Sequence, residues 1–110
     1  MEKCLFCQIA DKQISSRLAY EDDQIIAFCD INPKAPVHIL LVPKKHFASL
    51  NEMKERDKEL LGHLIYQAKV LAQNKGINEK GYRIIINTGQ YAGQEVKHLH
   101  VHLLGGKPMK

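Results

Sequence analysis

The chain has 110 residues, of which 45% are apolar and 25% charged, the composition of one ordinary globular domain. Its net charge of +4 comes from scattered basic residues, with Lys44-Lys45 as the only adjacent pair. This excludes a basic nucleic-acid-binding stripe and favours small anionic substrates. No apolar run approaches the ~20 residues of a membrane span, and the start of the chain is not a signal peptide. We therefore expect a cytoplasmic protein without a membrane partner.

The first half of the chain predicts a short helix followed by closely spaced strands. Residues 4–10 suit one or two helical turns, and strands are expected over 18–21, 24–30 and 37–42. A proline-punctuated loop over 31–36 separates the last two strands, and Pro43 ends the third. Cys29 lies alone in an apolar run and is expected in the core. Short connections favour antiparallel pairing, which makes the fold class α+β.

A long helix is predicted next. Ser49-Leu50-Asn51-Glu52 matches a capping box, and Gly76 stops the helix after about Asn74. An apolar stripe at helical spacing should pack on the sheet: Leu60, Leu61, Leu64, Ile65, Ala68, Leu71 and Ala72. Gly62, Tyr66 and Val70 form a smaller patch on the other side. That patch indicates either a homodimer contact or scattered surface apolar residues.

The end of the chain predicts a strand over 81–87, a glycine-bearing loop over 88–94 and a strand over 96–104. The N–H groups of the loop, including that of Gly93, are suited to holding a phosphate. In the last strand, period-two alternation places His98, His100 and His102 on one face, with Cα atoms ~6.6 Å apart. Three ordinary surface histidines are the alternative, but strict alternation favours a site for acid–base, nucleophilic or metal chemistry.

This segment, His98-Leu-His100-Val-His102-Leu-Leu, resembles the His-x-His-x-His-apolar-apolar signature of the histidine triad (HIT) family. The resemblance extends over nearly the whole chain and is closest to the Hint branch. Supporting segments are residues 28–38, 43–46, 81–83, 87–89 and 93–96. It implies a five-stranded antiparallel sheet with one long and one short N-terminal helix, as a single domain over 1–110 and a homodimer.

The resemblance also implies a purine nucleotide substrate and hydrolysis of a nucleoside 5′-phosphoramidate of the AMP–amine type, with aminoacyl-adenylates as a related class. His100 would attack phosphorus and form a nucleotidyl-histidine, which water then releases as AMP. A neutral imidazole is a competent nucleophile at pH 7 when an acceptor holds its second nitrogen. No metal is needed for this reaction.

Residue roles follow from the same resemblance. His102 would contact the phosphate, with His38 and His98 supporting the triad, and Asp30 would accept hydrogen bonds from the ribose. Asp30 capping its loop is the alternative. The phosphate would be surrounded by Asn87, Gly93, Gln94 and Val96, and the base slot would be formed by Phe6, Ile9, Ile14, Phe28, Ile31 and Leu40. For Phe6, Ile9 and Leu40 plain core packing is equally expected.

Two features depart from, or add to, this pattern. Glu95 stands where many members carry a serine that assists the leaving group, and an ionised carboxylate cannot donate a proton. Cys4-x-x-Cys7 supplies half of a tetrahedral zinc set. Some HIT relatives complete such a set with the positions that are His46 and His98 here, so we expect a structural zinc at these four residues.

Two other functions are also compatible with these residues. One is a catalytic metal ion bound by His98, His100 and His102, as in three-histidine zinc enzymes. The other is a nucleotide-binding scaffold with little turnover. Chelator sensitivity of the activity would identify the first, and trapping of a covalent adduct would exclude the second.

Overall fold

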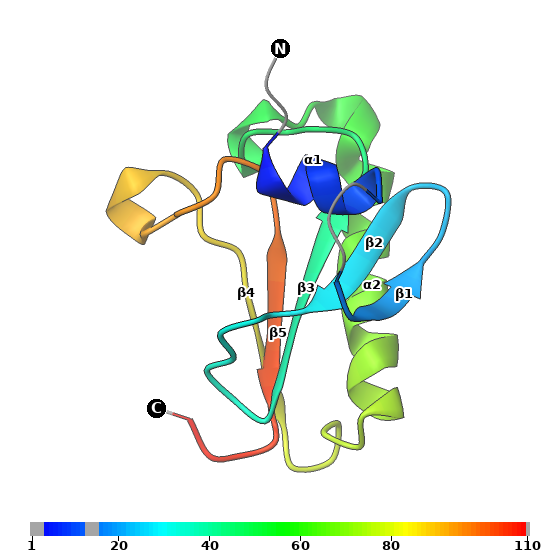
Figure 1. The fold of residues 1–110 in the computed structure, drawn as a ribbon, viewed down its shortest axis with the longest axis vertical. Helices are drawn as coiled ribbons and strands as arrows, with labels where there is room; N and C mark the ends of the chain where they lie inside the picture. The colour runs from blue at the N-terminus through cyan, green and yellow to red at the C-terminus, as the bar shows by residue number, and fades with distance from the viewer. Residues whose placement is uncertain (1–3, 13–15, 110) are drawn as a thin grey trace.

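Five strands form one antiparallel sheet in the order β1-β2-β3-β5-β4 in the computed structural model, which describes residues 4–12 and 16–109 (Figure 1). The strands are β1 (Leu18–Glu21), β2 (Ile25–Cys29), β3 (Val37–Pro43), β4 (Tyr82–Ile85) and β5 (Val101–Gly105). The predicted α+β class and antiparallel pairing are confirmed. Ile14 lies outside the described residues.

The helices lie on opposite faces of this sheet. The short helix α1 (Leu5–Ala10) crosses the face toward the viewer in Figure 1, and α2 (Lys58–Asn74) runs behind it. Among the described residues, no helix combines the length and apolar character needed to cross a bilayer.

The start of the long helix was predicted wrongly. Ser49 accepts a hydrogen bond from the N–H of Asn51, as a cap does, but the chain makes only the 3-10 turn η1 (Leu50–Glu52) there. A second turn, η2 (Glu55–Asp57), follows before α2 begins at Lys58. The side chain of Glu52 bonds the N–H of Ala48, one residue before the cap, so the capping box does not close on Ser49.

Alternation along the strands sends one set of side chains to each helix. On the α2 face the core contains Ile25, Ala27, Ile39, Leu41, Val101 and Leu103, packed against Leu64, Ala68 and Leu71. On the α1 face Ile26, Phe28, Leu40 and Val42 pack against Phe6 and Ile9. Because both faces are covered, β2 and β3 read as nearly continuous apolar runs.

The histidine-bearing strand is shorter than predicted. β5 begins at Val101, so His98 and His100 precede it in an irregular segment and only His102 lies in the strand. Leu99 is still buried on the α2 side and its N–H bonds the carbonyl of Phe47 at 2.7 Å. Release from the ladder lets His98 and His100 contact different neighbours.

Candidate active site

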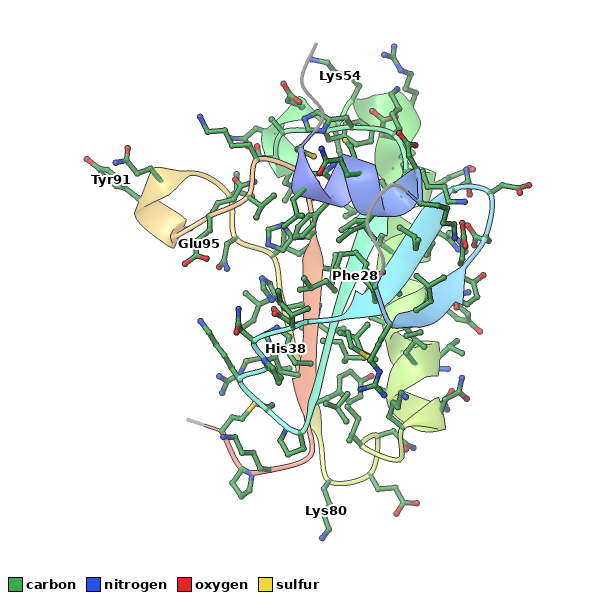
Figure 2. The ribbon with its side chains drawn as sticks, viewed as in Figure 1. Phe28, His38, Lys54, Lys80, Tyr91 and Glu95 are labelled. Carbon is green, nitrogen blue, oxygen red and sulfur yellow. The ribbon has the colours of Figure 1, made fainter. Side chains whose placement is uncertain are left out.

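A cavity of about 460 Å³ opens on the α1 face of the sheet, beside His100 and His102. Its lining residues that the sequence predicted for nucleotide binding or catalysis are Phe6, Ile9, Phe28, Asp30, Ile31, His38, Leu40, Asn87, Gly93, Val96, His100 and His102. The apolar side chains from α1, β2 and β3 form one wall. Glu95 lies on the side of β5 toward the 3-10 turn η3 (Gln90–Ala92), and Phe28 lies on the opposite side (Figure 2).

Some lining residues were missed: Leu5, Ser16, Cys29, Asn32, Lys34, Ile85 and Leu104. Cys29, expected in the core, is half-buried and reaches this cavity. The prolines around Lys34 were a usable signal, because they restrict the loop whose Lys34 N–H bonds His38 at the start of β3. Gln94, predicted at the phosphate, is not a lining residue.

The Gln94 side chain instead braces the loop before the histidines. Its amide group donates to the carbonyls of Ala48 and Val96 at 2.7 and 3.0 Å, and its oxygen accepts from the N–H of Gly89. Gly89 and Gly93 both have positive φ, at 84° and 79°, which a glycine adopts without strain. Gln94 therefore fixes the path of the loop between Gly89 and Val96.

His100 is held in one tautomer by its own backbone. Its Nδ1 lies 2.8 Å from the carbonyl oxygen of His98, so Nδ1 carries the proton and donates it. Nε2 is then left with its lone pair. The ring is 7% exposed and meets the Phe6 ring edge-on at 5.0 Å between centroids. His100 thus provides an oriented nucleophile beside the cavity.

A second chain of hydrogen bonds fixes the opposite tautomer at His102. The N–H of Lys34 donates to Nδ1 of His38 at 3.1 Å, so the His38 proton is on Nε2. That proton faces Nδ1 of His102 at 3.0 Å. His102 must then carry its proton on Nε2, which makes it a donor for an anion.

Burial keeps these two rings neutral. Burial lowers the pKa of His38, against the opposing effect of the Asp30 carboxylate. Burial also lowers the pKa of His102 to about 4, with further contributions from His100 and His38. Both rings are therefore uncharged at pH 7, and the chain of tautomers persists.

Asp30 uses its two carboxylate oxygens for different purposes. Oδ1 accepts the N–H of Asn32 at 2.9 Å, which is the loop-capping role raised as an alternative. Oδ2 lies 3.4 Å from Nε2 of His38, and the residue lines the cavity. One residue thus orders the loop and places acceptor atoms at the cavity.

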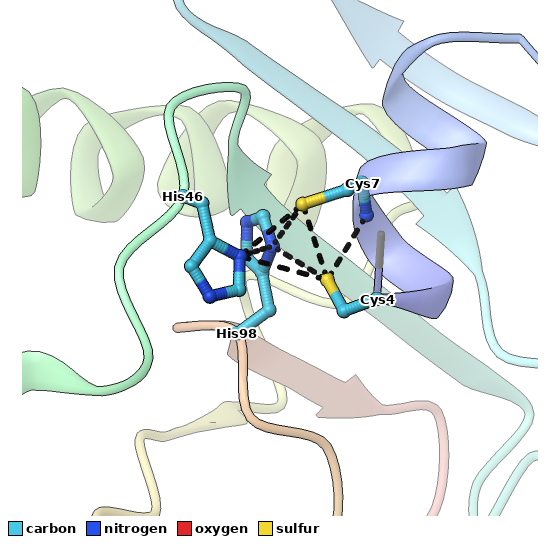
Figure 3. Close-up of side chains that lie close together, drawn as sticks. All are labelled: Cys4, Cys7, His46 and His98. Atoms are coloured by element: carbon cyan, nitrogen blue, oxygen red, sulfur yellow. Dashed lines mark hydrogen bonds between the residues drawn. The ribbon is translucent and has the colours of Figure 1, made fainter. Parts of the chain in front are cut away.

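The cysteines lie in a separate cluster with His46 and His98 (Figure 3). The Sγ atoms of Cys4 and Cys7 are 3.2 Å apart, and the Nδ1 atoms of the two histidines are 3.1 Å apart. The four sulfur–nitrogen distances are 3.2 to 3.6 Å. Four potential ligands therefore converge on one point.

This arrangement fits a tetrahedral zinc ion. A Cys2His2 site with ordinary Zn–S and Zn–N bonds has edges of roughly 3.3 to 3.8 Å. The observed N–N and S–N edges lie within a few tenths of the corresponding values, and the S–S edge is about 0.6 Å shorter. Nε2 of His98 lies 2.8 Å from the carbonyl oxygen of Pro43, so its proton is held there and Nδ1 is free to bind a metal. The predicted four-residue set is brought together from three distant parts of the chain.

The three-histidine metal site is not formed. His98 turns toward the cysteines, and the other metal-capable group among residues 4–12 and 16–109 is Asp30, His38 and His102. In that group the facing nitrogens of the two histidines are already joined by a hydrogen bond. His98, His100 and His102 thus contribute to two different sites.

Comparisons with known proteins assign the fold and its paired histidines to the class of HIT-domain proteins. Residues 11–109 match the HIT domain. The chain is 43% identical over 108 residues to a purine nucleoside phosphoramidase of Escherichia coli K12, covering 98% of this chain and 91% of that protein. The crystal structure of a HIT family hydrolase from Legionella pneumophila superposes with a TM-score of 0.96 at 48% identity, covering 98% and 96% of the two chains.

A third relative concerns the cysteine cluster. The chain is 49% identical over 107 residues to a 14 kDa zinc-binding protein of Zea mays, covering 96% of this chain and 83% of that protein. These matches extend over nearly the full length of the chain. The protein belongs to the HIT family.

Proposed function

We propose that this protein hydrolyses the P–N bond of purine nucleoside 5′-phosphoramidates through a nucleotidyl intermediate on His100. The observation that carries the proposal is the 2.8 Å contact between Nδ1 of His100 and the carbonyl of His98, which leaves the Nε2 lone pair free. The similarity to a purine nucleoside phosphoramidase supports the substrate class.

The reaction follows from the two tautomers. Nε2 of His100 attacks phosphorus, the P–N bond breaks, and its electron pair leaves on the amine nitrogen, which takes a proton from water. The Nε2–H of His102 donates to a phosphoryl oxygen as negative charge develops there. Water then attacks phosphorus, the P–Nε2 bond breaks and AMP is released. One water molecule is consumed overall, and His100 returns to its neutral state.

The rest of the cavity supports the nucleotide. The apolar wall that includes Phe28 and Leu40 suits a purine ring, and Asp30 provides acceptors for ribose hydroxyls. Asn87 and the backbone at Gly93 and Val96 line the end toward the phosphate. The amine leaves on the side of the exposed Glu95.

Rapid-quench trapping tests the proposal. With an AMP–amine carrying 32P, we expect a labelled protein adduct that forms before steady state and is absent in His100→Ala. His63→Gln is the matched control, because His63 lies on α2, paired with Asp22 and outside the cavity. An unlabelled wild-type protein that nevertheless binds AMP would identify a nucleotide-binding scaffold instead.

We further propose that Cys4, Cys7, His46 and His98 hold a structural zinc ion. When bound, the zinc would cross-link α1 to the segment before β5, without taking part in the chemistry. The convergent ligand atoms and the zinc-binding relative support this assignment. Metal analysis of freshly purified protein should give about one zinc per chain, and a metal-free protein would refute it.

We also propose that the protein is a cytoplasmic homodimer, as the resemblance implies. Tyr66 on α2 is 58% exposed, and Val70 on the same side is half-buried, which is compatible with a partner surface. Sedimentation equilibrium that gives a monomer mass would remove the dimer.

A further inference from the structure

We propose that the Cys4/Cys7/His46/His98 cluster and the nucleotide cavity are coupled, with Phe6 and the backbone of His98 as the connection. Metal ligation then positions His100, and nucleotide binding in turn tightens the hold on the metal. The inference rests on the proposed zinc and nucleotide sites and adds a linkage between them.

The first connection runs through Phe6. This residue lies in the chain between the two cysteines, and its side chain is 4% exposed. Its ring contacts the ring of His100 edge-on, with centroids 5.0 Å apart and planes at 79°, and that of His98 at 6.0 Å and 70°. It also lines the cavity. Phe6 is thus a positioning residue that touches both sites.

The second connection runs through His98 itself. Its Nδ1 belongs to the cluster and its Nε2 is held by Pro43, so ligation would fix the ring at both nitrogens. The carbonyl of the same residue accepts the proton of His100 Nδ1. Movement of His98 would therefore disturb the hydrogen bond that sets the tautomer of the nucleophile.

The helix that carries the cysteines depends on the cluster. α1 has six residues, and a helix of that length is not stable by its own hydrogen bonds. Its N-cap is the Cys4 sulfur, which accepts the N–H of Cys7 at 3.3 Å. Phe6 and Ile9 are its two buried residues, and both line the cavity. Loss of ligation would release the helix and with it one wall of the nucleotide site.

Coupling of this kind is reciprocal. If the metal improves nucleotide affinity by some factor, the nucleotide improves metal affinity by the same factor. The zinc dissociation constant, measured by competition with a chromogenic chelator at equilibrium, is therefore a readout that does not depend on turnover. We expect saturating AMP to lower it by about 5-fold or more.

A substitution at Phe6 tests the link between the two sites without removing any of the four metal ligands. Phe6→Ala keeps all four ligands, and we expect the effect of AMP on zinc affinity to fall below 2-fold, with Phe6→Leu intermediate. Ile9→Ala is the control, because it removes apolar volume from the same helix and the same cavity wall. Equal loss of coupling in Ile9→Ala would overturn the role of Phe6.

Imidazole NMR gives a second readout on the positioning of His100. Removing zinc from the intact protein should shift the 15N resonances of His100 and leave those of His63 unchanged. A zinc affinity that AMP does not alter overturns the linkage, even if the protein cleaves phosphoramidates. Conversely, AMP-dependent zinc affinity without turnover sustains the linkage and refutes the proposed reaction.

Discussion

Nε2 of His38 lies 3.0 Å from Nδ1 of His102. Through this contact the tautomer of His38 on β3 determines the tautomer of His102 on the neighbouring strand β5. The proton order begins at the N–H of Lys34 and ends at Nε2 of His102, beside the cavity. A backbone group in a loop thereby decides which nitrogen of a histidine in β5 is a donor.

Breaking this chain should lower turnover. His38→Ala removes the donor that fixes His102, and we expect kcat to fall by up to about 100-fold with a smaller change in KM. His38→Asn retains an N–H donor and should recover part of the loss. Long-range 15N NMR would show His102 as mixed tautomers in His38→Ala. A single Nε2–H tautomer in that variant would contradict the mechanism.

The pH dependence follows from the depressed pKa of His102. Between its ordinary pKa of 6.5 and its value of about 4 in the fold, the unfolded chain binds more protons than the folded one. The contribution of His102 to stability is therefore fully present above about 6.5 and is lost as pH falls toward about 4. Urea titrations over this range should show a falling midpoint, with a shallower fall in His102→Gln. An equally steep fall in that variant would exclude His102 as the source.

Zinc ligation should contribute measurably to stability. Cys4→Ser removes one of four ligands and the N-cap of α1, and we expect zinc content well below one per chain. A loss of about 2 kcal/mol would lower Tm by roughly 10 °C. Cys29→Ala is the control, since this third cysteine lies on β2 outside the cluster and should leave zinc content unchanged. Thermal unfolding and metal analysis on the same samples test both expectations.

Two glycines should respond to alanine in opposite ways. Gly106 has φ of +96°, and an added Cβ would lie 2.9 Å from Cβ of Pro36, so Gly106→Ala should cost about 1–3 kcal/mol. In Gly62→Ala, on α2, the added Cβ meets no atom within 4 Å, and stability should rise by about 0.5–1 kcal/mol. Chemical denaturation measures both changes. If Gly106→Ala left the free energy of unfolding unchanged, the turn would have adjusted to the added methyl group without strain.

Glu95 should influence the choice of leaving group. Its exposed carboxylate lines the cavity, so a leaving amine with a second positive charge should be favoured over a neutral one. We expect Glu95→Gln to reduce that preference about 2- to 5-fold, the scale of an exposed ion pair. The ratio of kcat/KM for AMP joined to 1,4-diaminobutane and to butylamine measures it. Glu79→Gln, outside the cavity, is the control. An equal effect in that variant would indicate that the preference arises from the net charge of the protein and not from Glu95.

Sequence periodicity alone predicted much of this architecture. Apolar runs in residues 24–30 and 37–42 identified two strands, and helical spacing from Leu60 to Ala72 identified the face of α2 that packs on the sheet. The histidine pattern and the C-x-x-C pair are likewise visible in the sequence, and each marks one of the two clusters. These features are local, because the side-chain period of a strand or helix is written into consecutive residues.

The tertiary structure decided what local patterns do not contain. Ser49 resembles a helix cap, but α2 begins only at Lys58 after two 3-10 turns. The pairing of His38 with His102 depends on the register of β3 against β5, across 64 positions of the chain. Cys4 meets His98 across 94 positions because α1 lies over the start of β5 (Figure 1). Contacts between distant residues are set by strand register and helix docking, so only the folded chain shows which histidine faces the cavity and which faces the cysteines.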